Sequence, residues 1–524
     1  MIELKDVSLP LDGDLKTACA KKLRLPVSQL EDAVLLRRSV DARKKNDVHF
    51  TVTAAVSLRG SEKGYSPYVP WTAPSVTVLK ARPAHRPVVC GAGPAGLMAA
   101  LTLARAGAEP ILIERGAPIE ERRRDVERFR LTRVLDMESN VQFGEGGAGA
   151  FSDGKLTSGI KDVRARQVLH ALAEAGAPEE ILWQAKPHIG TDMLPRTVRG
   201  LRSAVMAAGG EVRFHTRLTD IRVDSGVLSG VTVRTVSGDE LIPADALILA
   251  GGHSARDLFS LLYEKGVALR QKPFSMGVRC EHPQEFIDRA QYGAFAGHPA
   301  LGAADYKLSV HLPDGRGVYT FCMCPGGTVV AAASEEGGLA VNGMSVFARD
   351  GKNANAALLC DVRPEDFGSD HPLAGVAFQR RWERAAFLAG GGDWRAPAQL
   401  LGDFLAGSPS AGAGRVEPTY PLGVRWGSLD GCLPEFALAS LREAIPLFDR
   451  KLRGFAMADA VLTGIESRSS SPVRIPRDET GQSSLPGLFP CGEGAGYAGG
   501  ILSAGADGIR QAENVLAFLE AGAI

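Results

Sequence analysis

The spacing G-x-G-x-x-G occurs three times in this sequence, beginning at Gly91, Gly144 and Gly494. Glycines at this spacing let a backbone turn approach a phosphate closely, but only where a strand ends before the turn and a helix begins after it. The amides at such a helix N-terminus are unpaired and attract a pyrophosphate. The elements around each copy therefore decide which of them binds a nucleotide.

The first copy lies in the required context. An apolar run at 88–90 predicts a strand, and 94–106 predicts a helix of small and apolar residues that ends at Gly107. A second predicted strand, 110–114, ends in Glu114, whose carboxylate can accept both hydroxyls of a ribose and would repel a 2′-phosphate. We predict a dinucleotide site here, with an incidental glycine turn as the alternative. Its residues are Gly91, Gly93, Pro94, Ala95, Gly96, Glu114 and Arg115.

The second copy, Gly144, Gly146 and Gly149, has no convincing strand before it and no apolar-periodic helix after it. It therefore predicts a loop rather than another dinucleotide site. A glycine-rich loop can lie against a planar ring such as a flavin, because its backbone approaches closely where side chains are missing. The alternative is a plain structural loop.

The third copy lies between a predicted strand, 487–491, and a final predicted helix, 501–518. Too few residues follow it for a complete strand–helix–strand unit. We predict that it returns to the first site and offers the carboxylate of Glu493 and the helix N-terminal amides of Gly500 and Ile501 to the same ligand. Such amides stabilise negative charge that develops on a reduced flavin. The alternative is a helix that only closes the sheet.

These loops resemble the FAD domain shared by the glutathione-reductase-like and fumarate-reductase-like flavoproteins. The resemblance implies that the first turn and Glu114 hold the ADP half of FAD, and that Leu218 makes a backbone contact to adenine. It also implies that Ala250 and Gly251, in the string LILAGG at 247–252, lie near the cofactor, and that Gly492 and Glu493 contact the ribityl chain. FAD is thus the expected cofactor.

Four longer strings look like a group of predicted FAD-dependent dehydrogenases, and this likeness extends over nearly the whole chain. The strings are QFGEGGAGAFSDGKL at 142–156, KPHIGTD at 186–192, GGHSARD at 251–257 and SPVRIPRD at 471–478. The resemblance implies a cofactor class and no substrate. No further unit of strand, glycine turn and helix with an acidic partner occurs, so NAD(P)H would have to reduce the flavin without a dedicated domain, or the electron donor would be the substrate itself.

Two residues are candidates for the catalytic chemistry. His188, in a polar loop, could titrate near neutrality and move a proton, or it could be a hydrogen-bonded loop histidine. Lys155 could favour a reduced flavin anion by its charge, or it could be a solvated lysine. His253 follows the strand at 247–252, and a structural contact is expected for it.

Three arginines and two cysteines are further candidates for binding or redox roles. Arg468, Arg474 and Arg477 could bind an anionic substrate or the FAD phosphates, or they could be surface arginines. Cys322 and Cys324 form C-x-C, which could be a redox pair near flavin, although buried inert thiols are the simpler interpretation. The pair is too small for a zinc site, and no metal is expected.

The pattern of elements predicts an α/β fold: a Rossmann-type FAD-binding domain with an inserted α+β substrate domain and a small N-terminal α/β domain. Between 60 and 87 five prolines predict an extended linker. The predicted regions are an accessory domain at 1–60, a linker at 61–86, the FAD domain at 87–270, the substrate domain at 271–454 and the second FAD segment at 455–524.

Sixty basic residues balance sixty acidic ones, and no apolar run is long enough to span a membrane. With no signal-peptide pattern at the N-terminus, a cytoplasmic protein is expected. The predicted function is an FAD-dependent oxidoreductase, a dehydrogenase or reductase that acts on a small molecule by two-electron transfer. The alternative is a flavoprotein that binds RNA or another acidic partner through the basic residues of 21–45, although these lack interleaved aromatics and are offset by acidic neighbours. The sequence sets no oligomeric state.

Overall fold

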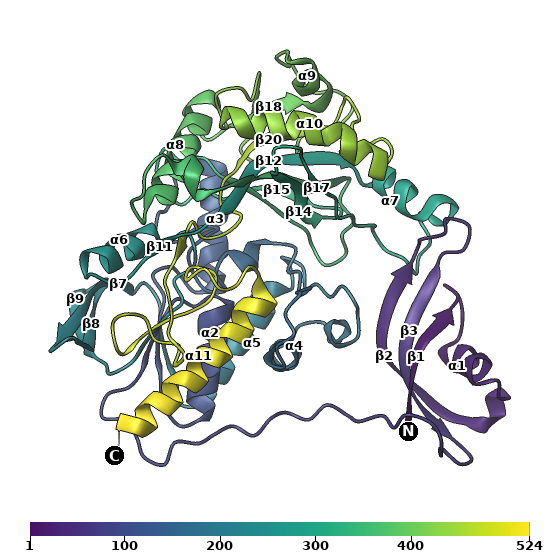
Figure 1. Cartoon of the computed structure of the whole chain (residues 1–524), viewed down its shortest axis with the longest axis horizontal. Helices are drawn as coiled ribbons and strands as arrows, with labels where there is room; N and C mark the ends of the chain where they lie inside the picture. Colours follow the sequence, from purple (N-terminus) through teal and green to yellow (C-terminus); the bar gives the residue numbers. More distant parts are fainter. Residues whose placement is uncertain (523–524) are drawn as a thin grey trace.

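The computed structural model describes residues 1–522 (Figure 1). Its first region is a parallel sheet covered on both faces. The strand order is β22-β10-β4-β5-β6, and every neighbouring pair is parallel. The three central strands are entirely apolar and buried, as expected for a sheet with no solvent face. The strands are β4 (Val88–Cys90), β5 (Ile111–Ile113), β6 (Glu211–Arg213), β10 (Leu247–Leu249) and β22 (Leu488–Pro490).

Helices cover one face of this sheet, and a smaller sheet covers the other. The helical layer packs through one continuous apolar cluster and consists of α2 (Pro94–Arg105), α4 (Arg164–Glu174), α5 (Leu194–Ala207) and α11 (Ile501–Gly522). The second face carries the antiparallel sheet β7-β8-β9 and one helix. These elements are β7 (Arg217–Asp224), β8 (Val227–Thr235), β9 (Gly238–Pro243) and α6 (Arg256–Glu264). A further helix, α3 (Ile119–Thr132), follows β5. The predicted α/β fold class is confirmed.

A seven-stranded mixed sheet forms the second region, and its carboxylate- and arginine-bearing strands face the first region. The strand order is β13-β14-β17-β12-β20-β18-β19, with only the last pair parallel. Its strands are β12 (Phe274–Pro283), β13 (Ser309–His311), β14 (Gly317–Cys324), β17 (Asn353–Val362), β18 (Ala396–Leu400), β19 (Val424–Trp426) and β20 (Val461–Glu466). The hairpin β15 (Thr328–Ala331) and β16 (Val341–Met344) packs against it.

Four helices accompany this sheet, and each of them contacts at least one of its strands. They are α7 (Gln284–Tyr292), α8 (Ala374–Ala389), α9 (Leu401–Ala406) and α10 (Glu435–Lys451). A short pair, β11 (Arg270–Gln271) and β21 (Val473–Arg474), joins the two regions. Because β20 pairs with β12 and β18, the predicted boundary at 454/455 is wrong: the chain leaves this sheet only after Glu466.

The sequence pattern did not reveal β12 and β17. Nine of the ten residues in each are buried, so no alternation of polar and apolar residues marks them as strands. By contrast, β14, β15 and α8 coincide with runs whose sequences are strand-like at 319–323 and 328–333 and helix-like at 376–387. Interior strands of this kind are recognised by their partners rather than by their own sequence.

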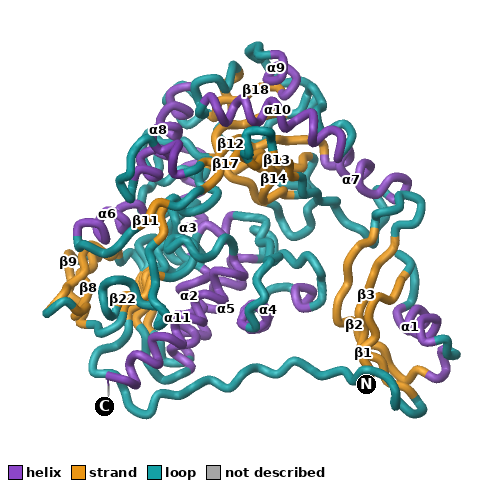
Figure 2. Tube along the Cα trace, viewed as in Figure 1, coloured by secondary structure: helices purple, strands orange, loops and turns teal. Residues whose placement is uncertain are grey.

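The N-terminal module is a three-stranded sheet of order β1-β3-β2 with a helix on one face. Its elements are β1 (Ile2–Leu9), α1 (Leu15–Leu23), β2 (Leu30–Asp41) and β3 (His49–Leu58). The edge strand β2 is bonded to the first region, since the Arg38 amide donates to the Trp183 carbonyl and the Ala185 amide donates to the Arg38 carbonyl. An extended chain without helix or strand then runs from the module back to β4 (Figure 2).

Within residues 1–522, no helix is both long enough and apolar enough to cross a membrane.

Candidate functional site

A cavity of about 1550 Å³, including its open mouth, lies where the carboxyl ends of the parallel strands meet the seven-stranded sheet. This is the edge at which parallel α/β sheets bind ligands. The structure brings to its wall every predicted cofactor residue except Gly96. These are Gly91, Gly93, Pro94, Ala95, Glu114, Arg115, Leu218, Ala250, Gly251, Gly492, Glu493, Gly500 and Ile501.

The first glycine turn is a close backbone contact between β4 and β10. Gly91 has φ +104°, and a Cβ there would lie 2.4 Å from the Ala250 carbonyl oxygen. A Cβ on Gly96 would lie 1.7 Å from the Gly91 carbonyl oxygen, so Gly96 supports the turn from behind. No side chain caps the N-terminus of α2, where Gly93 is the N-cap and Pro94 follows it. The turn therefore leaves helix amides free to meet a ligand.

Glu114 joins the first turn to the second glycine loop. Its Oε2 accepts from the Ala92 amide at 2.8 Å, and its Oε1 accepts from the amides of Gly116 and Gly144 at 3.0 Å each. The side chain is 6% exposed and lines the cavity. A ribose placed at this carboxylate would lie between both glycine segments.

Arg122, which the sequence reasoning missed, organises the second glycine loop. This fully buried guanidinium on α3 donates only to backbone carbonyls and to no carboxylate. Burial lowers the pKa of Arg122 to about 10, although Glu114 and Glu145 oppose this change. The acceptors are the carbonyls of Asn140, Val141, Gly144, Glu145 and Gly147.

The position of Arg122 in its helix is a signal that could have identified it. Ile119, Arg122 and Phe129 lie at helical spacing and form the buried face of α3, whereas the other arginines of this helix are at least partly exposed. With its carbonyls held by Arg122, the loop lies against the first turn, where a Cβ on Gly147 would be 3.1 Å from the Cα of Gly93. Gly144, Gly147 and Gly149 line the cavity.

The C-terminal segment returns to the same cavity. Gly492 donates its amide to Asp507 Oδ2 at 2.8 Å, and Asp507 also pairs with Arg477 at 3.0 Å. Burial raises the pKa of Glu493 to about 7, and the nearby Lys272 opposes this rise. The Oε1 of Glu493 lies 3.6 Å from Nδ1 of His253, which also lines the cavity. A structural contact was the expectation for His253, and the structure places this residue on the cavity wall.

His253 is largely buried, and its pKa lies far below neutrality. Burial together with the charges of Arg468 and Arg256 lowers its pKa to about 3. Its Nε2 is buried and has no hydrogen-bond partner among the described residues. A neutral imidazole at this position can donate or accept one hydrogen bond to a ligand in the cavity.

Of the two predicted catalytic residues, only Lys155 lines the cavity. Its Nζ donates to Asp153 Oδ2 at 2.7 Å and to the Met323 carbonyl. Although burial opposes ionisation, Lys155 and Arg349 lower the pKa of Asp153 to about 2. The ammonium is therefore already paired and joins the loop of the first region to β14.

His188 does not line the cavity, so the structure does not support the catalytic role predicted for it. Its Nε2 bonds the Phe347 carbonyl at 3.0 Å, and its ring stacks on the Phe347 ring with centroids 5.2 Å apart. Burial and the charge of Arg349 lower its pKa. These contacts agree with the alternative hypothesis, that His188 is a hydrogen-bonded loop histidine.

Two charged residues of the wall opposite the glycine turns, Glu466 and Arg468, belong to buried ion pairs. Arg279 on β12 donates from Nε to Glu466 at the end of β20, and its remaining nitrogens donate to the Cys322 carbonyl and to Asn355 and Asn342. Burial raises the pKa of Glu466, and Arg279 opposes this rise. Both partners are nearly inaccessible to solvent outside the cavity.

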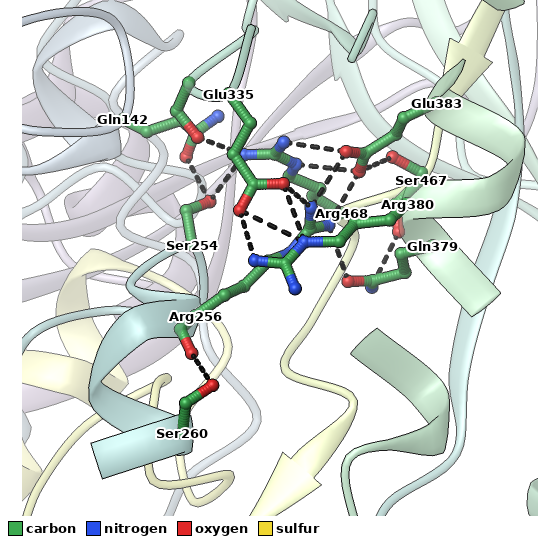
Figure 3. A network of polar contacts seen from close by, with 11 residues as sticks. Gln142, Ser254, Arg256, Ser260, Glu335, Gln379, Arg380, Glu383, Ser467 and Arg468 are labelled. Carbon is green, nitrogen blue, oxygen red and sulfur yellow. Dashed lines mark hydrogen bonds and ion pairs between the residues drawn. The ribbon is translucent and has the colours of Figure 1, made fainter. Parts of the chain in front are cut away.

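Glu383 on α8 is the centre of a second buried network, shown in Figure 3. It accepts from Arg256 at 2.8 Å and from Arg468 at 2.8 Å. Despite burial, these two arginines hold the pKa of Glu383 well below its usual range. Arg468 also donates to Ser254 and Ser334, so this arginine of the cavity wall has no nitrogen without a protein acceptor.

The other two arginines of this group also have protein partners. Arg474 stacks on Tyr497, with its guanidinium carbon 4.4 Å from the ring centroid, and Arg477 pairs with Asp507. Two of the basic residues that suggested nucleic-acid binding also contact protein groups. Lys45 donates to the Gln291 carbonyl, and Arg38 lies over the rings of Phe50 and Trp183. Residues 1–522 contain no group of histidine, cysteine or acidic residues that could hold a metal.

The cavity fits a dinucleotide. Glycines 93, 499 and 500 would place a Cβ in open space or at ordinary contact distance, so here the missing side chains leave room for a ligand rather than for protein. Free helix amides, a ribose-binding carboxylate and a wall of close backbone contacts are the donor and acceptor set that the two phosphates and ribose of FAD require. The site thus belongs to the class of dinucleotide-binding α/β proteins.

Comparisons with known proteins identify the dinucleotide. A family model described as "FAD binding domain" matches residues 86–258, and one described as "FAD-dependent protein, C-terminal domain-like" matches 273–469. A third model, described as a domain of unknown function, matches 1–57. A protein of Clostridium beijerinckii is 46% identical over 529 residues, which cover 98% of both chains. This chain belongs to the same family of FAD-dependent proteins, and it is a flavoprotein.

Solved structures resemble the chain only distantly. They include the flavin-dependent brominase Bmp2, with a TM-score of 0.40 and 11% identity over 84% of this chain and 80% of that one. A geranylgeranyl bacteriochlorophyll reductase-like protein of Thermoplasma acidophilum has a TM-score of 0.37 and 14% identity over 83% of this chain and 78% of that one. Superpositions at this level carry no argument about the activity.

Proposed function

We propose that this flavoprotein is an oxidoreductase, a dehydrogenase or reductase, that acts on a small molecule by two-electron transfer. One observation carries the proposal: the glycine turns that fit the cofactor share a single cavity with polar side chains of the seven-stranded sheet. When bound, FAD supplies the hydride chemistry, and the protein has to position the substrate and manage a proton.

The first region would bind and orient the cofactor. The free amides of α2 and α11 meet negative charge, and Glu114 accepts from ribose hydroxyls. Arg122 keeps the carbonyls of the second glycine loop directed away from the ligand. Lys155 would contribute positive charge to the cavity wall, reduced by its pairing with Asp153.

The second region would bind the substrate. Phe321, Asn342, Glu466 and Ser469 face the cavity from this side. Since every nitrogen of Arg279 and Arg468 already has a protein acceptor, a small anion would be recognised less strongly than a neutral ligand that donates to Glu466 and Asn342. Reduction by NAD(P)H would require the nicotinamide to enter this same cavity.

The proposal is tested by purifying the protein and recording its visible spectrum, followed by anaerobic mixing with NADH, NADPH and a panel of small metabolites. The expected result is a yellow protein whose flavin absorbance is bleached by at least one donor. A matched Glu114→Ala variant should bind less FAD, because the ribose hydroxyls lose their acceptor. A wild-type protein that binds FAD but is reduced by no donor and oxidised by no acceptor in the panel would contradict an oxidoreductase. No described contact favours the RNA-binding alternative.

A further inference from the structure

The C-x-C sequence ends β14 on the wall of the cavity. Cys322 and Cys324 both line it, together with the neighbouring ring of Phe321. All eight cysteines of the chain are free, and Cys322 is exposed whereas the other seven are buried. The interpretation of inert buried thiols therefore does not describe Cys322.

A β-bulge brings the two cysteines to the same cavity. The pairing of β14 with β17 shifts between Phe321 and Cys324, and Cys322 has φ +40°, a left-handed conformation that is strained for a residue with a side chain. The thiol of Cys324 donates to the carbonyl of Cys322 at 3.1 Å. The sulfur of Cys324 thus turns back toward Cys322 rather than away along the strand.

Two cations hold the bulge in place. Arg279 donates from Nη1 to the Cys322 carbonyl at 2.9 Å, and Lys155 donates from Nζ to the Met323 carbonyl between the cysteines. A strained conformation persists where its surroundings determine it from several sides, and such positions cluster at functional sites. Burial raises the pKa of both thiols, and the charges of Lys155 and Arg279 oppose this rise.

We propose that Cys322 and Cys324 form a dithiol site that reduces small disulfides entering the cavity. The sulfur of Cys322, as a thiolate, attacks one sulfur of the substrate disulfide, which forms a mixed disulfide and releases one thiol. The sulfur of Cys324 then attacks Cys322, which closes an internal disulfide and releases the second thiol. Two electrons pass from the cysteines to the substrate, and the two cysteine protons end on the two released thiols. This exchange requires no cofactor, so it goes beyond the proposed flavin reaction.

Accessibility assigns the two roles. Cys322 meets the substrate because it is exposed in the cavity, and Cys324, at 1% exposure, acts only on the mixed disulfide beside it. Although Cys322 is the exposed member of the pair, the protein atoms around its sulfur raise the pKa of this thiol to about 12, and Lys155 and Arg279 oppose this rise. Below that pKa the thiolate fraction, and with it the rate of exchange, should rise about tenfold for each unit of pH.

The test exposes the full-length protein with bound FAD to hydroxyethyl disulfide and follows each cysteine by peptide mass spectrometry. In the wild type, the peptide that carries both cysteines should lose two hydrogens and retain no adduct. Cys324→Ser should stop at a hydroxyethyl adduct on Cys322, and Cys322→Ser should form neither product. Cys432→Ser, at a fully buried cysteine of the same region, is the matched control and should react as the wild type does.

The visible spectrum of bound FAD and the circular dichroism of each variant show whether it is folded, independently of thiol reactivity. Folded wild-type protein in which Cys322 reacts no faster than the buried cysteines would overturn the proposal. A stable adduct on wild-type Cys322 with no internal disulfide would overturn it as well. Either result leaves the proposed flavin chemistry intact, because donor-dependent bleaching is measured separately.

Discussion

The two walls of the cavity are built by different means. The wall from the parallel sheet consists of backbone: glycine turns, free helix amides and contacts too close for a Cβ. The wall from the seven-stranded sheet includes Glu466 and Arg468, which are paired with other buried charges across segments distant in sequence. The turn of the first wall leaves no room for added atoms at Gly91 and Gly96, whereas the second wall depends on charges that neutralise one another, and four substitutions test this contrast.

The largest effect is expected for Glu383→Gln. Removing this carboxylate leaves Arg256 and Arg468 buried without their common partner, and breaking a buried pair costs about 3–5 kcal/mol of unfolding free energy. Glu335→Gln is the matched control: this carboxylate also pairs with Arg256 but is 28% exposed, so about 1 kcal/mol or less is expected. Denaturant unfolding measures both. Equal losses of unfolding free energy in the two variants would show that the buried ion pair contributes no more to stability than the partly exposed one.

Gly96→Ala should cost about 1–3 kcal/mol and abolish FAD binding, because its Cβ would lie 1.7 Å from the Gly91 carbonyl oxygen and would displace the turn. Gly412→Ala, where a Cβ meets nothing within 4 Å, is the control and should change stability by less than about 0.5 kcal/mol. Flavin fluorescence titration gives the affinity. Normal FAD affinity in Gly96→Ala would contradict the inference that close backbone contacts shape the FAD-binding wall.

Arg122→Met tests whether a side chain is needed to support a wall made of backbone. Five carbonyls lose their donor, and we expect the Kd for FAD to rise about tenfold or more, equivalent to about 1.4 kcal/mol. Arg123→Met, one residue further on an exposed position of the same helix, should bind FAD as the wild type does. An Arg122→Lys variant should recover part of the affinity, since an ammonium can still donate to some of these carbonyls.

The smallest effect is a pH dependence from Glu493. Because its pKa rises from 4.5 to about 7 on folding, the folded protein keeps a proton that the unfolded chain has released. In protein freed of FAD, the unfolding free energy should therefore fall as the pH increases across that range. Glu493→Gln removes this term, so its stability should vary less between the two ends of the range. Denaturant unfolding at both pH values compares the two proteins, and parallel curves would contradict the raised pKa.

The first wall was largely predictable from the sequence. Turn, helix and second strand of the first glycine copy follow one another within 88–114, so their residue types and spacing identify them directly. The return of the C-terminal segment to this cavity could be inferred because its strand is apolar and its glycine turn precedes a helix. Among the predicted cofactor residues, Gly96 alone does not line the cavity, because it faces the Gly91 turn instead.

The second wall was not predictable in this way. Glu383 lies 127 residues from Arg256 and 85 from Arg468, and no local pattern distinguishes it from the exposed charges of α8. The same limit explains the prediction of His188 over His253: a polar loop favours an exposed histidine, but only packing against Phe347 shows that His188 faces away. Likewise, C-x-C predicts a pair of thiols and not which of them is exposed.

The sequence by itself determined the dinucleotide turn, its acidic partner and the α/β class, because these depend on residues that are neighbours along the chain. Only the tertiary structure decided which charges are buried together, where the seven-stranded sheet ends and that Cys322 opens into the cavity. Burial and ion pairing are properties of surfaces that meet in space, and the segments that form them here are separated by up to 214 residues.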